Sequence, residues 1–142
     1  METRERGSAM NAPTVKVMTV DDHAVFRDVA REVIAATVGF EHVCEARCGE
    51  EALALADEYG PDLVLIDVQM PGIDGLETAR RLRASHPAST TVLISTADIP
   101  SLPGEFASCG AVAFVRKENF GPSVLQRLWT EHGPRPSPGT AD

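Results

Sequence analysis

The stretch Leu63-Val64-Leu65-Ile66-Asp67 decides the fold of this sequence. Four apolar residues follow one another without polar alternation, and an aspartate comes directly after them. Such a short apolar run is typical of a central strand in a parallel sheet, which is buried on both faces. Turn residues come next, in Met70-Pro71-Gly72-Ile73-Asp74-Gly75. We therefore predict a buried strand whose carboxyl end carries Asp67.

Further strands and helices alternate on both sides of this strand, which is the pattern of an α/β fold with a parallel sheet. In the first helix, Val25, Val29, Val33 and Ile34 lie on one apolar stripe. We predict strands at 15–20, 42–47, 63–66, 91–95 and 112–115, and helices at 24–38, 50–59, 76–84 and 123–131.

Three segments lack a regular pattern. Pro100, Pro103 and Gly104 interrupt the segment after Asp98, so the helix expected there is short or irregular, with at most one short helix over 105–109. Residues 1–13 are polar and charged, and 133–142 are rich in Pro and Gly. We predict a disordered arm at 1–13, one folded domain at 14–132 and a disordered tail at 133–142.

Composition narrows the function classes. The 142 residues carry 21 acidic and 13 basic side chains, a net charge of −8, without a dense basic run. Nucleic-acid binding needs a basic surface, so no nucleic acid is expected as a partner. No apolar stretch is long enough to span a bilayer and the first residues do not resemble a secretory signal, so we expect a cytoplasmic protein without a membrane partner. Three cysteines without a C-x-x-C motif predict no disulfide framework.

Polar side chains end four of the predicted strands. The first ends in Asp21-Asp22, the third in Asp67, the fourth in Ser95-Thr96, and Arg116-Lys117 follows the fifth. In an open parallel sheet the carboxyl ends of the strands share one edge, where ligands bind. These carboxylates, hydroxyls and the ammonium group are therefore expected to meet.

Each of these groups has a chemical use. Crowded carboxylates repel one another, and a hard cation such as Mg²⁺ or Mn²⁺, which prefers oxygen ligands, relieves that repulsion. A carboxylate can attack phosphorus and form an aspartyl phosphate. Phosphoryl transfer then needs neutralisation of the phosphoryl oxygens, which a cation and a lysine supply, and a threonine hydroxyl can donate a hydrogen bond.

Four motifs in this order resemble the response-regulator receiver family of two-component signalling, over about residues 15–131. They are Asp21-Asp22, Asp67 with Met70-Pro71 and Gly75, Thr96-Ala97, and Phe114-Val115-Arg116-Lys117. Receivers of the NarL/FixJ type are most similar at Asp22-His23 and from Asp67 through Gly75-Leu76. The resemblance implies a flavodoxin-like (CheY-like) doubly wound sandwich with five parallel strands in the order 2-1-3-4-5.

The resemblance also implies a role for each site residue. Asp67 is the phosphoacceptor. The metal shell consists of Asp22 as a direct ligand, Asp21 mostly through water, Asp67 itself and the backbone carbonyl of Gln69. Thr96 and Lys117 hold the phosphoryl group, and Phe114 occupies the position of the switch aromatic, although ordinary core packing explains a Phe there nearly as well. The phosphoryl donor is a sensor histidine kinase or a phosphotransfer protein.

The sequence departs from the family pattern in the proline-broken segment after Asp98, where the family has a regular fourth helix, and in two further places. Glu118 stands where many receivers have a proline, so no cis peptide is expected after Lys117. No output domain follows the last predicted helix, so we expect a stand-alone regulator read by an unknown downstream protein. His23 is not expected to bind the metal, because hard cations prefer oxygen, and should begin the helix facing outward. His42, His86 and His132 are expected at the surface.

Two other classes of protein are alternatives. The first is a receiver-fold interaction module that is not phosphorylated, which a gap among the site residues would favour, and none is present. The second is a phosphatase with an aspartate nucleophile, which would need a second aspartate at position 69, where this chain has Gln69. We expect no enzyme activity beyond self-phosphorylation and slow self-dephosphorylation.

Overall fold

A five-stranded parallel sheet forms the centre of the chain, in a computed structural model that describes residues 14–70, 72–96 and 108–134. The order β3-β2-β4-β5-β6 equals 2-1-3-4-5 when the strands are counted along the chain, as predicted. The strands are β2 (Val15–Val20), β3 (Phe40–Ala46), β4 (Leu63–Asp67), β5 (Thr90–Ser95) and β6 (Ala113–Arg116).

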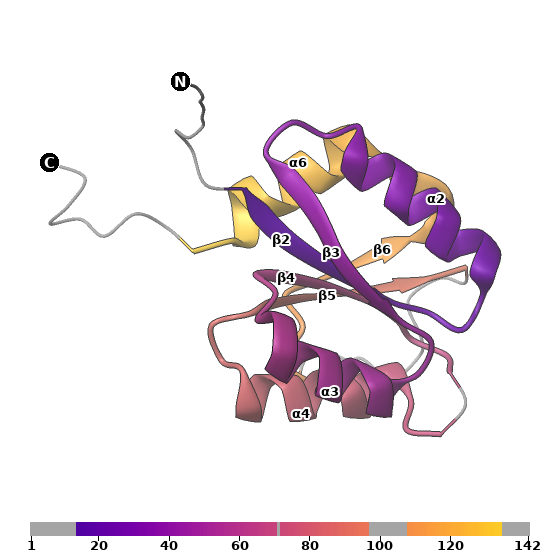
Figure 1. Cartoon of the computed structure of the whole chain (residues 1–142), viewed down its shortest axis with the longest axis vertical. Helices are drawn as coiled ribbons and strands as arrows, with labels where there is room; N and C mark the ends of the chain where they lie inside the picture. The colour runs from indigo at the N-terminus through magenta and orange to yellow at the C-terminus, as the bar shows by residue number, and fades with distance from the viewer. Residues whose placement is uncertain (1–13, 71, 97–107, 135–142) are drawn as a thin grey trace, which may run out of the picture.

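Helices cover both faces of the sheet (Figure 1). Helices α2 (Ala24–Ala35) and α6 (Pro122–His132) pack on one face, and α3 (Gly49–Tyr59) and α4 (Gly75–Ser85) pack on the other. A short 3₁₀ helix, η1 (Lys117–Asn119), follows β6 and was not predicted. The fold is thus the expected doubly wound α/β sandwich.

Strand β4 contributes to the core on both of its faces. Val64 and Ile66 pack with α3 and α4, whereas Leu63 and Leu65 pack with α2 and α6, and all four are almost fully buried. Successive side chains of a strand point to opposite faces, so an unbroken apolar run fills both cores. The predicted central strand is confirmed, and Asp67 is its last residue.

The apolar stripe predicted for the first helix is confirmed at Val33 and Ile34, which pack against the core, and wrong at Val25 and Val29. Helix α2 buries Phe26, Ala30 and Ile34, whereas Val25 and Val29 are 77% and 44% exposed. Arg27, the residue after Phe26, contacts residues at the ends of β2 and β3. Its guanidinium donates to the Asp21 carbonyl (2.7 Å) and lies 3.4 Å from Glu45. The Phe26 ring packs in the core that α2 and α6 share.

The turn after β4 brings helix α4 directly against the strand end. Asp74 caps the helix, and its carboxylate accepts the backbone N–H of Glu77 at 2.9 Å. The next residue, Gly75, has no room for a side chain, because a Cβ there would overlap the backbone carbonyl of Asp67. Glycine therefore permits the close approach that fixes the position of Asp67.

Other boundaries differ from prediction by a few residues. Helix α2 ends at Ala35, before the predicted 38, and Gly39 then turns the chain with a positive φ of 90°. Three predictions fall outside the described residues. They concern the arm at 1–13, nearly all of the tail, and the irregular segment from Asp98 to Gly104. Among those described, all three cysteines are free, and no helix combines the length and the apolar character that crossing a membrane requires.

Candidate functional site

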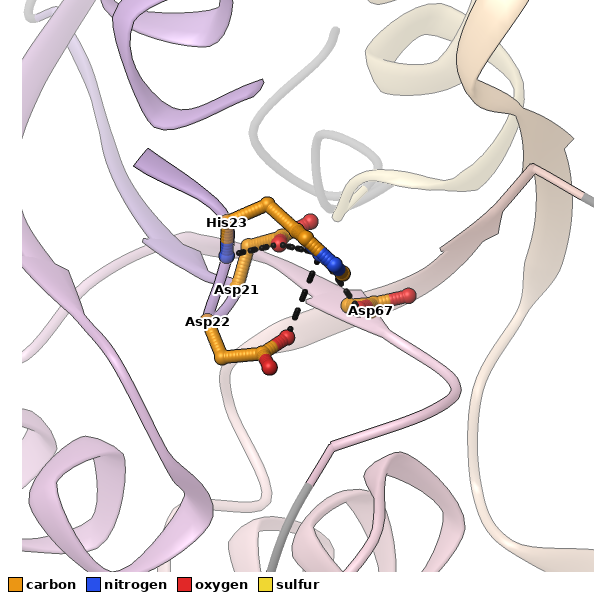
Figure 2. A group of neighbouring side chains, drawn as sticks. All are labelled: Asp21, Asp22, His23 and Asp67. Carbon is orange, nitrogen blue, oxygen red and sulfur yellow. Dashed lines mark hydrogen bonds and ion pairs between the residues drawn. The ribbon is translucent and has the colours of Figure 1, made fainter. Parts of the chain in front are cut away.

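Three carboxylates meet at the carboxyl edge of the sheet, as the strand ends predict. Asp21 and Asp22 follow β2, and Asp67 ends β4 (Figure 2). Together with His23, each offers a ligand atom, and these four atoms lie within 4.8 Å of one another. Asp21 and Asp67 are buried, whereas Asp22 is partly exposed. The edge therefore concentrates negative charge in a site that solvent reaches from one side.

Lys117 brings the ammonium group expected at this edge. Its Nζ lies 2.7 Å from Asp21 Oδ2 and 3.8 Å from Asp67 Oδ2. The same Nζ lies 4.8 Å from the ring centroid of Phe26, which stacks at an angle on Phe120. This cation–π contact was not predicted, because the stripe assigned to the first helix left Phe26 out.

The environment of Asp67 disfavours its charged form. Burial, and after it the neighbouring Asp21 carboxylate, raise the pKa of Asp67 from 3.8 to about 6 once all its neighbours are counted. Lys117 and the backbone N–H of Gln69, which is 3.4 Å from Asp67 Oδ1, lower the pKa and offset part of the rise. A perturbed carboxyl in a cleft is a feature of functional sites.

A pocket of about 570 Å³ opens above Asp67. Thr96 is exposed and lines it, whereas Ser95 is buried at the end of β5, so Thr96 is the hydroxyl placed to meet a bound group. The residues lining the pocket are His23, Val25, Phe26, Val29, Asp67, Gln69, Thr96, Lys117 and Glu118. The predicted site residues Asp67, Thr96, Lys117 and Gln69 thus share one pocket.

Phe114 lies apart from this pocket. It sits on β6, pairs in register with Leu93, and packs as a half-buried side chain against the core beneath α3 and α4. The peptide between Lys117 and Glu118 is trans, as expected, since no cis peptide occurs in the described part of the chain. The switch role of Phe114 remains a prediction.

His23 begins the helix and is exposed, as expected, but its ring also contacts the acidic group. It precedes α2 as the N-cap residue and is 65% exposed, but its ring turns back over the acidic group. The backbone N–H of His23 donates to Asp21 Oδ1 at 2.8 Å, which holds the side chain above that carboxylate. Its position next to Asp21-Asp22 at a helix start was the signal that sequence reasoning discounted.

The other histidines also have partners. His42 was expected at the surface, but it is half-buried and its Nε2 lies 3.2 Å from Thr19 Oγ1. Burial lowers the pKa of His42. His86 pairs with Asp57 at 2.7 Å, between helices α4 and α3.

The donors at this edge fit a hard divalent cation. Three carboxylates face one ammonium group, which leaves an excess of negative charge. Asp21 Oδ2 is fully buried and accepts no well-oriented hydrogen bond, although Lys117 lies beside it. Carboxylate oxygens are the ligands that Mg²⁺ and Mn²⁺ prefer. The residues present are therefore suited to such an ion.

Comparison with known sequences points to one family. The family model for the response regulator receiver domain matches residues 17–128. The response regulator GacA of Pseudomonas aeruginosa is 39% identical over 103 residues, covering 72% of this chain and 48% of that protein. The transcriptional regulatory protein DegU of Brevibacillus brevis is 30% identical over 119 residues, covering 84% and 50%. The chain thus spans about half the length of these curated relatives.

Solved structures give the same result. The signal receiver domain of the putative response regulator NarL from Mycobacterium tuberculosis is similar with a TM-score of 0.76 and 29% identity, covering 83% of this chain and 95% of that one. The chemotaxis protein CheY4 of Vibrio cholerae is similar with a TM-score of 0.73 and 26% identity, covering 83% and 98%. The chain therefore belongs to the response-regulator receiver domain family of two-component systems.

Proposed function

We propose that this chain accepts a phosphoryl group on Asp67 from a phosphohistidine of a sensor histidine kinase or phosphotransfer protein. The observation that carries the proposal is the place of Asp67, a buried carboxylate at the floor of an open pocket with Lys117 Nζ at 3.8 Å. As the P–N bond of the donor breaks, a bond forms between phosphorus and a carboxylate oxygen of Asp67.

The neighbouring residues supply what phosphoryl transfer requires. We propose that Asp22, Asp67 and the carbonyl of Gln69 hold Mg²⁺ or Mn²⁺, with Asp21 supporting it through water. When bound, the cation neutralises charge on the phosphoryl oxygens. Lys117 neutralises charge from the other side, and the Thr96 hydroxyl donates a hydrogen bond to the transferred group.

The contacts of Lys117 support its role. Its stem is buried, and its ammonium group is held between Asp21 Oδ2 and the Phe26 ring. A cation held in place before the donor arrives loses little freedom during transfer. We propose that Phe114, at the edge strand β6, then passes the change at Asp67 to a surface that a downstream protein reads.

Intact mass spectrometry tests the phosphoacceptor. The full chain is incubated with Mg²⁺ and a small acyl phosphate, and wild type should gain the mass of one phosphoryl group. Asp67→Asn should gain none. Asp62→Asn is the matched control, because Asp62 directly precedes β4, at the end of the strand away from Asp67. This variant should be labelled as wild type is. Unlabelled wild-type protein would instead favour an interaction module that is not phosphorylated.

A further inference from the structure

The imidazole of His23 points into the acidic group although the proposed phosphoryl transfer gives it no task. Its Nδ1 lies 3.1 Å from Asp21 Oδ1, 3.3 Å from Asp22 Oδ1 and 3.9 Å from Asp67 Oδ2 (Figure 2). One nitrogen atom thus approaches a carboxylate oxygen of each of the three aspartates. The side chain comes from the residue directly before α2, while its partners come from the ends of β2 and β4.

The hydrogen bond of 3.1 Å between His23 Nδ1 and Asp21 Oδ1 requires a proton on Nδ1, unless a metal ion lies between the atoms. Ionised carboxylate oxygens offer only lone pairs, and an imidazole nitrogen carries either a proton or a lone pair. Asp21 Oδ1 already accepts the backbone N–H of His23 at 2.8 Å. The space between Nδ1 and the aspartates is therefore suited to a proton on Nδ1 or to a metal ion that takes the proton's place.

The distances match those between ligands of one metal ion. Ligand atoms about 2.1 Å from an ion lie about 3.0 Å apart when adjacent in an octahedron and about 4.2 Å apart when opposite. In a tetrahedron they lie about 3.4 Å apart. The two shorter distances of Nδ1, 3.1 and 3.3 Å, fit adjacent ligands, whereas the 3.9 Å to Asp67 lies between the adjacent and the opposite separations.

We propose that His23 Nδ1 is an additional ligand of the divalent cation at this edge, and that it shifts the preference of the site from Mg²⁺ toward Co²⁺, Ni²⁺ and Zn²⁺. Imidazole nitrogen favours these later metals, whereas Mg²⁺ prefers oxygen alone. This inference rests on the proposed metal site for its location, but it does not depend on phosphoryl transfer.

Calorimetric titration of the full chain, free of any histidine tag, tests the shift in preference. His23→Ala should weaken Co²⁺ binding by at least about tenfold while the Kd for Mg²⁺ changes by less than about twofold. His86→Ala is the matched control, because His86 also pairs with an aspartate, Asp57, but lies outside the site. It should leave both affinities unchanged.

Pulsed electron paramagnetic resonance of the Mn²⁺ complex tests ligation directly. Wild type should show coupling to an imidazole ¹⁴N nucleus, and His23→Ala should not. His23→Asn provides a second variant whose fold is secure, because Asn is a favoured N-cap residue, and it should also lack the imidazole coupling. Absence of nitrogen coupling in wild type, or an unchanged ratio of Co²⁺ to Mg²⁺ affinity in His23→Ala, overturns the inference.

Phosphoryl labelling of the same wild-type sample separates this inference from the proposed function. Protein that is labelled with Mg²⁺ but shows no nitrogen coupling overturns the role of His23 and supports Asp67 as phosphoacceptor. Protein that shows nitrogen coupling but is not labelled supports His23 as a ligand and overturns phosphoryl transfer.

Discussion

Asp62 directly precedes β4 and Asp67 is its last residue, and the surroundings of these two side chains differ sharply. Asp62 Oδ2 accepts the backbone N–H of Lys16 at 2.9 Å, and its own backbone bonds to Lys16 and Thr90 tie β4 to both neighbouring strands. Asp67 accepts one long backbone bond and faces two further aspartates. One carboxylate contributes to the fold, whereas the other is kept charged at a cost to stability, as functional sites often require.

The largest expected effect comes from removing the charge at Asp67. In metal-free protein above pH 7, Asp67→Asn should raise the free energy of unfolding by up to about 3 kcal/mol, because a pKa raised by about two units corresponds to that penalty. Chemical denaturation of both proteins measures the difference. A less stable Asp67→Asn variant would contradict the cost assigned to this end of the strand.

The pH dependence of the stability gained by Asp67→Asn tests whether ionisation of Asp67 is its cause. The folded pKa of Asp67 is about 6 against 3.8 for an ordinary aspartate, so the folded state binds more protons between these values. The contribution of Asp67 to stability therefore falls as pH rises from about 4 to about 6. The advantage of Asp67→Asn should vanish below about pH 4, and an equal advantage at pH 4 and pH 8 would exclude an ionisation effect.

Removing the carboxylate of Asp62, just before β4, should lower the free energy of unfolding, whereas removing the charge of Asp67 should raise it. Asp62→Ala leaves the Lys16 N–H without its side-chain acceptor, so unfolding should become easier by about 2 kcal/mol. Urea denaturation at pH 7 measures this loss, with Asp57→Ala, at an exposed helix position, as the control. An Asp62→Ala protein as stable as wild type would remove the distinction between the two aspartates.

Mg²⁺ binding should also distinguish the acidic group at the carboxyl end of β4 from Asp62 at its start. Asp22→Ala removes a proposed ligand and should weaken Mg²⁺ binding at least about tenfold, or about 1.4 kcal/mol. The measurement is calorimetric titration, with Asp62→Ala as the variant expected to bind as wild type does. Equal affinity of Asp22→Ala and wild type would place the cation elsewhere.

The smallest effect is expected at the apolar rim of the pocket. Val29 lines the pocket but is 44% exposed, so Val29→Ser should change the free energy of unfolding by no more than about 0.5 kcal/mol. Thermal or chemical denaturation checks this. A larger loss of unfolding free energy would show that the apolar rim of the pocket, and not only the charge at Asp67, determines the stability of this end of the sheet.

The sequence predicts the sheet well because its strands are apolar runs that end at charged or polar residues. The order of strands followed from family resemblance, whereas the meeting of Asp21, Asp67 and Lys117 followed from their places at the carboxyl ends of parallel strands, which share one edge. Side-chain direction was harder. Val25 and Phe26 are both apolar neighbours, and the spacing of apolar residues does not say which of them is buried. The contact of the His23 ring with Asp21 was not predicted, because the ligand preference of a hard cation says nothing about where the ring lies.

Strand β4 has a kinetic consequence for the amides within it. It pairs with β2 on one side and β5 on the other, and its apolar side chains are buried on both faces. Opening its backbone requires breaking two ladders and two cores, so the amide hydrogens of Val64 to Ile66 should exchange with solvent only through global unfolding. Asp67 therefore ends the strand whose amide hydrogens exchange most slowly. A charge added to its side chain would stay fixed in place while the residues around it rearrange.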